Sequence, residues 1–238
     1  MEKLDLQKKP DREDPRVFQD DEMQELLESV KTQYLLWLII TIIKETGMRR
    51  SEVLGLQWKH IIFQDGEIFV EQQLYKHNKS FAVKKPKSKK GIRKIPMTRY
   101  LHGILEKHYS AQQNGKAKLD GNLNEWDYVI VNEIFERIDP NRVTEWMREA
   151  MHELDHKEIK EDKPVKWVGR GLHSVRHTFA SYAIRAGVNV AELSVILGHH
   201  SKMFTLKTYA HLFENSKREA MDKIEAYRDG IQSKKIDP

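Results

Sequence analysis

The 238-residue sequence contains no cysteine. This absence excludes disulfide bonds, thiolate metal sites and cysteine nucleophiles, and it agrees with a reducing cytosol. A membrane-spanning segment is also missing, because the apolar run over residues 35–43 is much shorter than the roughly 20 residues that a helix needs to cross a bilayer. The sequence opens without a secretory signal and shows no internal repeat. From these absences we expect a soluble protein of the cytoplasm.

An excess of positive charge is present but small, with 41 Lys and Arg against 36 Asp and Glu and a net charge of +5. This excess alone does not indicate nucleic-acid binding. The basic residues are unevenly distributed, however, and seven of the eleven residues at 84–94 are basic. By itself such a segment is typical of a solvated loop or a localisation signal. Beside the arginines and histidines described below, it predicts a hairpin tip that contacts phosphate.

Two helices are predicted near the N-terminus. Asp20 or Asp21 is expected to cap the first, whose apolar stripe lies within residues 23–30. The second, at residues 34–46, is apolar on nearly all sides, which is typical of a buried central helix. Gly47 is expected to end this helix, so that the residues after it lie at the rim of the core.

The spacing of the apolar residues changes in the middle of the chain. Residues 61–63 and 68–70 are apolar and flank Asp65-Gly66, a pattern typical of a β-hairpin, and a third strand is expected over 92–97. The other expected elements are helices at 100–112, from 139 onwards and at 202–227, a strand at 128–131 and a mobile charged segment at 156–166. These elements indicate an α+β fold that is mostly α-helical, with a small antiparallel three-stranded sheet on a helical body.

Four short motifs occur in order along the chain. They are T-G-M-R-R-S-E at 46–52, H-S-V-R-H at 173–177, L-G-H at 197–199 and Tyr209. An H-x-x-R pair alone is usually a surface pair or a satisfied core pair, although its spacing places both side chains on one helix face. The four motifs together, in this order, resemble the tyrosine recombinases, the phage-integrase family. The resemblance extends from about residue 18 to about residue 213.

The residue types suit the cutting of DNA without a metal ion. Arg49 and Arg176 offer permanently charged guanidinium groups for the negative charge that gathers on a phosphate in its transition state. Tyr209 is a nucleophile whose phenol, with an ordinary pKa of ~10, needs a proton acceptor. His173 is the nearest candidate in the sequence for this role, and His199 can donate to a phosphate oxygen. The leaving 5′ oxygen needs a proton, which a lysine can deliver.

The resemblance implies the same residues. Carried over by motif, the family's catalytic residues correspond to Arg49, Lys87, His173, Arg176, His199 and Tyr209. Glu52 matches an acidic position that supports the site. Lys89 and Lys90 remain alternatives to Lys87. His199 is preferred over His200 because it directly follows the Leu-Gly pair.

Two further interpretations concern the histidines of the H-S-V-R-H motif. His177 is expected to pack or form a hydrogen bond in the interior. His173 and His177 have the spacing of zinc ligands, but the acidic residue of an H-E-x-x-H motif is missing. We therefore expect neither a metal ion nor a cofactor.

The resemblance also implies a domain organisation and partners. Residues 1–17 are interpreted as a linker or arm, 18–213 as the catalytic domain, and 214–238 as a C-terminal helix and tail that contacts a neighbouring protomer. The family's N-terminal DNA-clamping domain has no counterpart, which leaves either a catalytic-domain fragment or a natural minimal form, and we prefer the fragment. Double-stranded DNA is the expected partner, with a homotetramer on DNA and a monomer when free.

The leading hypothesis is a site-specific recombinase or integrase that forms a 3′-phosphotyrosyl intermediate through Tyr209 and religates without metal or ATP. A type IB topoisomerase shares this chemistry. A DNA-binding regulator that uses the helix pair at 174–198 is an alternative from another class, but it leaves Arg49, Tyr209 and the lysine-rich segment unexplained. The sequence does not distinguish integration, excision and dimer resolution, nor does it give the DNA target.

Overall fold

The structure is a computed structural model that describes residues 17–77, 80–86, 89–119, 121–210, 221 and 224–228. Its main α-helices are α1 (Asp20–Ser29), α2 (Tyr34–Thr46), α3 (Arg50–Val53), α4 (Arg99–Ala117), α5 (Pro140–Lys160), α6 (Leu172–Arg185), α7 (Val190–Leu197) and α8 (Lys202–Tyr209). Its strands are β1 (Ile61–Ile62), β2 (Glu67–Val70), β3 (Gln73–His77), β4 (Ser80–Lys84) and β5 (Arg93–Pro96). The predicted fold, mostly α-helical with a small antiparallel sheet, is confirmed.

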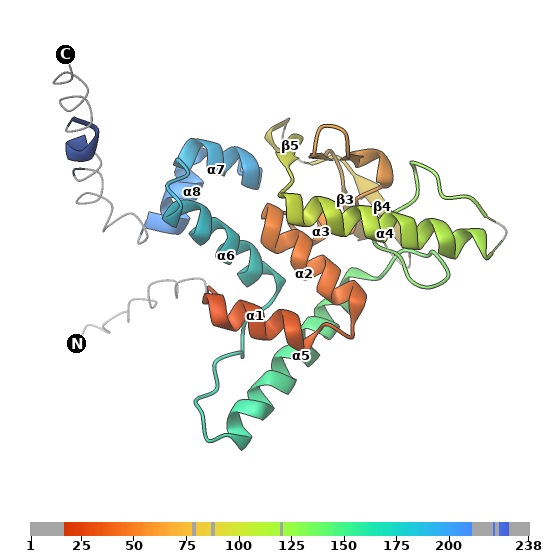
Figure 1. Cartoon of the computed structure of the whole chain (residues 1–238), viewed down its shortest axis with the longest axis horizontal. Helices are drawn as coiled ribbons and strands as arrows, with labels where there is room; N and C mark the ends of the chain where they lie inside the picture. The colour runs from red at the N-terminus through yellow and green to blue at the C-terminus, as the bar shows by residue number, and fades with distance from the viewer. Residues whose placement is uncertain are drawn as a thin grey trace, which may run out of the picture.

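Helix α2 lies in the middle of the helical body, and the strands gather on one side of it beside α4 (Figure 1). Its side chains Ile39, Ile40 and Ile43 are fully buried, and α2 contacts α1, α3, α4, α5 and α6. The prediction of a buried central helix is therefore confirmed, with both ends as expected. Among the described helices, none combines the length and the apolar character that crossing a bilayer requires.

Gly47 ends α2 in the left-handed conformation, with φ +65°, and its N–H donates to the Ile43 carbonyl oxygen. A side chain cannot be accommodated here, because an added Cβ would lie 2.4 Å from the Phe179 ring and 2.9 Å from Leu197. The end of α2 therefore abuts α6 and α7. This close approach brings the residues after Gly47 next to the two C-terminal motifs.

The three predicted strands form one antiparallel sheet in the order β1-β2-β5, with Ile68 opposite both Ile61 and Ile95. Gly66 makes the turn between β1 and β2 with φ +65°. A second antiparallel hairpin, β3-β4, was not predicted. Its apolar residues are neighbours in the sequence, Leu74-Tyr75 and Phe81-Ala82-Val83, and do not alternate with polar ones, so the pattern that marks a half-buried strand is weak.

Three local expectations need correction. Gln19, rather than Asp20 or Asp21, precedes the first turn of α1, and its N–H donates to the Glu22 carboxylate (2.9 Å). Residues 128–131 contribute isolated bridges instead of a strand, because the backbone pairs only briefly with Gln57 and Arg137. The segment expected to be mobile from residue 156 is helical as far as Lys160.

The C-terminal motifs lie on short helices, as expected. Asn189 caps α7 by accepting from the Glu192 N–H (2.9 Å), and Gly198 ends it with φ +63°. Helix α8 ends at Tyr209. The predicted continuation to residue 227, the N-terminal arm and the C-terminal tail fall largely outside the described residues.

Candidate active site

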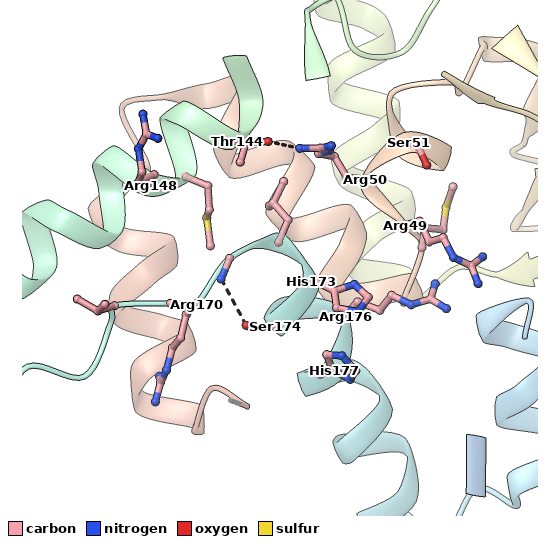
Figure 2. A pocket seen from close by; sticks show the side chains of 16 residues that line it. Arg49, Arg50, Ser51, Thr144, Arg148, Arg170, His173, Ser174, Arg176 and His177 are labelled. Atoms are coloured by element: carbon pink, nitrogen blue, oxygen red, sulfur yellow. Dashed lines mark hydrogen bonds between the residues drawn. The ribbon is translucent and has the colours of Figure 1, made fainter. Parts of the chain in front are cut away.

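A pocket lies where two of the four motifs, at 46–52 and 173–177, approach one another. It is lined by residues 48–51, by one face of α5, by residues 168–171 and by the start of α6. Figure 2 shows His173, Arg176 and His177 close together on α6, with Arg49 beside them from the segment before α3. The structure therefore brings together side chains that are more than 120 residues apart in the sequence.

Arg176 is buried between the C-terminal ends of two helices. Its guanidinium donates to the Gly47 carbonyl oxygen at the end of α2 (2.5 Å) and to the Leu197 carbonyl oxygen at the end of α7 (2.7 Å). Both carbonyls belong to helix ends, where the backbone carries partial negative charge. Burial, with the nearby charge of Arg49, lowers the pKa of Arg176 to about 9. The group thus keeps its proton near neutral pH.

Arg49 occupies the N-terminal end of α3. Its backbone N–H and its Nη1 each donate to the Glu52 carboxylate (2.8 Å for both), and its Nη2 lies 3.3 Å from the Gly198 carbonyl oxygen. The Arg49 side chain is 38% exposed, whereas Glu52 is buried. Arg49 therefore borders the pocket in a fixed orientation and still has surface for a ligand.

Glu52 has a second arginine partner that the sequence analysis did not single out. The buried Arg93 on β5 forms a bidentate ion pair with Glu52, from Nη2 to Oε2 (2.9 Å) and from Nη1 to Oε1 (3.1 Å). Arg93 faces inward with Ile95, whereas Lys94 between them is exposed. The two-residue period of a strand could have revealed it, because an arginine on the apolar face of a strand requires a partner.

The packing of Arg93 leaves no room for a side chain at residue 198, which can be tested. A Cβ at Gly198 would lie 2.8 Å from Arg93 Nη1, and the residue also has a positive φ. Gly198→Ala should therefore destabilise the protein by more than the roughly 1 kcal/mol that the positive φ alone costs. Gly66→Ala is the matched control, since Gly66 has nearly the same φ and nothing within 4 Å of an added Cβ. Urea unfolding measures both losses, and equal losses would contradict close packing of Arg93 on Gly198.

The two α6 histidines stack edge to face, with ring centroids 4.5 Å apart. Burial and the neighbouring Arg176 lower the pKa of His173. His177 Nδ1 lies 2.9 Å from the Tyr209 hydroxyl, and burial followed by the charge of His173 lowers the pKa of His177 to about 4. The prediction that His177 forms an internal hydrogen bond is confirmed. That its partner is Tyr209 was not foreseen.

Tyr209 is almost completely buried against Ala180, Leu193 and Leu197. This burial raises the pKa of Tyr209 to about 12, so its side chain is a neutral phenol near pH 7. The histidine that meets its hydroxyl is His177 and not His173, the nearest candidate by sequence motif.

His199 follows α7 directly and is buried, whereas His200 is exposed. Its Nδ1 forms a 2.7 Å hydrogen bond with the Thr205 hydroxyl, which fixes the ring orientation. Burial, followed by the charges of Arg176 and Arg49, lowers the pKa of His199 to about 3. The imidazole is therefore neutral at pH 7, and its Nε2 has no hydrogen bond to the described residues.

The structure gives little information on the lysine that is expected to protonate the leaving 5′ oxygen. Lys87 lies outside the described residues. Of its two alternatives, Lys89 begins a short 3₁₀ helix, and Lys90 Nζ donates to the His200 carbonyl oxygen (3.1 Å). No group of three or more histidine, aspartate or glutamate side chains suited to a metal ion occurs in the part of the chain that the structure describes.

Known proteins share this sequence pattern. The model of the phage integrase family matches residues 16–216. A tyrosine recombinase XerC-like protein of Caldanaerobacter subterraneus is 27% identical over 87% of this chain and 53% of its own length. The ICEBs1 integrase of Bacillus subtilis is 26% identical over 90% of this chain and 55% of its own length. The chain thus spans about half the length of these two relatives.

Solved structures share the fold. A structure of the Tn1549 transposon integrase in complex with transposon right end DNA matches 90% of this chain and 68% of that chain, with a TM-score of 0.74 and 23% identity. The XerA recombinase matches 92% of this chain and 66% of its own, with a TM-score of 0.60 and 23% identity. Because the family model covers most of the chain and includes all four motifs, this protein belongs to the phage integrase family.

Proposed function

We propose that the protein is a site-specific DNA recombinase that cuts and rejoins strands through Tyr209. The phenol oxygen attacks a backbone phosphorus, the bond to the 5′ oxygen breaks, and a 3′-phosphotyrosyl bond forms. Attack by a 5′ hydroxyl on this bond then rejoins DNA and restores the tyrosine, so that neither ATP nor a metal ion is consumed. The observation that carries the proposal is the convergence of Arg49, Arg176, His177 and Tyr209 from separate motifs.

The two arginines are suited to bind the attacked phosphate. Their charges lie close enough for Arg49 to lower the pKa of Arg176, and Glu52 compensates only part of this positive charge. A phosphate placed between them would relieve this repulsion and accept hydrogen bonds from two guanidinium groups. Because both groups are held by backbone carbonyls or by Glu52, little reorganisation is needed as charge develops on the phosphate.

The histidines are suited to move or donate protons. We propose that the Thr205 hydroxyl donates to His199 Nδ1, so that Nε2–H can donate to a phosphate oxygen. His177 holds the Tyr209 hydroxyl in the free protein, and neutral Nδ1 is able to accept the phenol proton. His173, which stacks on His177, remains the second candidate acceptor. Lys87 stays the proposed donor to the 5′ oxygen, on the resemblance alone.

The remaining proposals concern the whole protein. The Tn1549 integrase structure contains DNA, and we propose double-stranded DNA as the partner here. The division into a linker at 1–17, a catalytic domain at 18–213 and a C-terminal contact segment at 214–238 is retained as a proposal. A homotetramer on DNA and a free monomer also rest on the resemblance.

The chemistry is tested with duplex fragments from the ends of the mobile genetic element that we propose as the source of this protein. Each fragment carries a nick close to the cleaved phosphate, which traps covalent products. Fragments labelled at the 5′ end of the cut strand should give a slow band on a denaturing gel that protease removes. Fragments labelled at the 3′ end should instead release a shorter DNA with a free 5′ hydroxyl. A protease-sensitive band from the 3′ label alone would contradict the proposed polarity, and no band from either label would contradict the function.

The pH dependence of covalent attachment tests the proton acceptor. The pKa of His177 is about 4 and that of Arg176 about 9, so the acceptor is neutral and the arginine charged between these limits. We expect the second-order rate constant for attachment, which reports the free enzyme, to be level from about pH 6 to about pH 8 and to fall on both sides. Because the pKa of Tyr209 is about 12, its phenolate fraction rises about tenfold per pH unit between about pH 6 and about pH 8. An attachment rate that rises in the same way over this range would mean that attack requires a preformed phenolate.

A further inference from the structure

Arg93 is a buried arginine whose side chain donates four hydrogen bonds to protein groups. Its side chain is 2% exposed. Besides the ion pair with Glu52, its Nε donates to the Ile196 carbonyl oxygen (2.6 Å) and its Nη1 to the Gly91 carbonyl oxygen (3.1 Å). Arg93 therefore joins β5 to α3 and to the end of α7. Unlike Arg176, which is also buried, Arg93 does not line the pocket, so we do not expect it to contact DNA directly.

Three arginines bind consecutive carbonyl oxygens at the C-terminus of α7. Arg93 binds the Ile196 oxygen, Arg176 the Leu197 oxygen and Arg49 the Gly198 oxygen. His199 is the next residue along the chain. The last turn of α7 is thus held by three guanidinium groups, two of which are the proposed phosphate ligands. A shift of this turn would displace Arg49, Arg176 and His199 together.

The charge of Arg93 also affects Arg49 through Glu52. Arg49 and Glu52 alone would form a neutral pair, with the glutamate cancelling the charge offered to phosphate. Arg93 shares the same carboxylate, so that the three side chains carry a net charge of +1, and the exposed member is Arg49. Burial raises the pKa of Glu52, but the hydrogen bonds and charges of Arg93 and Arg49 outweigh it and keep the group ionised.

We propose that Arg93 is a positioning residue for strand cleavage, acting through Arg49 and the last turn of α7 without touching DNA. The inference rests on the proposed function, because its readout is the Tyr209-dependent covalent product. The competing explanation is that Arg93 serves only to stabilise the fold, in which case a folded variant would cleave normally.

Arg93→Lys is the informative variant. It keeps the positive charge beside Glu52 but loses the planar fork that reaches the carboxylate and the Ile196 oxygen together. Should this variant not fold, Gly198→Ala crowds the same guanidinium while leaving Arg93 in place. Lys116→Gln is the control for stability loss, because it breaks a half-buried ion pair with Asp127 (2.6 Å) that does not line the pocket.

The experiment is a double-mutant cycle on the first-order rate of covalent attachment, with the nicked duplex saturating and rates expressed per folded molecule. We expect Arg93→Lys to lower this rate about 100-fold, the size of effect that a misplaced catalytic group produces. DNA affinity, measured in a Tyr209→Phe background, should change by less than about threefold, because Arg93 does not meet the phosphate. Lys116→Gln should attach at the wild-type rate.

The cycle is completed with Arg49→Lys and the double variant. If Arg93 acts through Arg49 and the α7 turn that Arg49 also binds, the double variant should lose clearly less than the product of the two single losses, because the two changes disturb the same contacts. Rates that multiply, or a normal rate for Arg93→Lys, would overturn the inference while leaving the proposed function intact. Absence of any Tyr209-dependent product from the wild type would overturn both.

Discussion

Tyr209→Phe should abolish covalent attachment to DNA, because the phenol oxygen is the atom that forms the bond to phosphorus. The fold should survive, since the ring remains packed against Ala180, Leu193 and Leu197 and only the hydroxyl is removed. The change leaves His177 Nδ1 without its 2.9 Å partner, at a cost of about 1 kcal/mol in the free energy of unfolding. Denaturing gels of the labelled nicked duplex measure attachment, and thermal unfolding measures the fold.

The matched control for this variant is Tyr182→Phe. Tyr182 also lies on the helical body, but its hydroxyl interacts with Asp20, whereas the Tyr209 hydroxyl meets His177. Tyr182→Phe should therefore retain attachment, whereas Tyr209→Phe should show none above the background of heat-treated protein. Attachment by Tyr209→Phe at a measurable rate would show that another side chain is the nucleophile.

Arg176→Lys should lower the attachment rate about 1,000-fold at saturating DNA, comparable with the loss of one preorganised donor to a transition-state oxyanion. Lysine keeps the charge but cannot donate in a plane to two helix ends and to a phosphate at once. Stability should fall too, because two charge-assisted hydrogen bonds to buried carbonyls are lost, each contributing about 1.5–3 kcal/mol. Single-turnover kinetics and urea unfolding separate the two effects.

Arg185→Lys is the control on the same helix. Arg185 is exposed in the last turn of α6, so this change should leave both the rate and the stability near wild type. Folded Arg176→Lys could instead attach to DNA at a rate within about tenfold of wild type. This result would mean that Arg176 only stabilises the fold and that catalysis does not depend on its guanidinium group.

The sequence predicts those features that local patterns determine. The uniformly apolar helix α2, its end at Gly47, the Asn189 cap and the end of α7 at Gly198 all follow from propensity and capping rules. The three-stranded sheet follows from alternation and the Asp65-Gly66 turn. The hairpin β3-β4 was missed, because its apolar residues are adjacent in the sequence and give no alternation of apolar and polar positions.

The contacts within the candidate site are less predictable, because they depend on how distant segments pack. Nothing in the H-S-V-R-H motif indicates that its second histidine, and not its first, meets Tyr209. That choice depends on how α8 packs against α6. The contacts of three arginines with consecutive carbonyls of α7 are equally hard to predict from the sequence, because Arg49, Arg93 and Arg176 come from three separate elements. The sequence motifs identify the candidate residues, and tertiary packing determines which groups these residues contact.

The most direct measurement is the location of the protein–DNA bond. Wild-type protein trapped on the nicked duplex is digested with nuclease and trypsin, and the peptide that carries the remaining nucleotides is sequenced by mass spectrometry. Our proposal predicts a nucleotide joined through its 3′ phosphate to Tyr209. Nucleotides on any other residue, or a covalent product that lacks a phosphotyrosine, would contradict the proposed reaction.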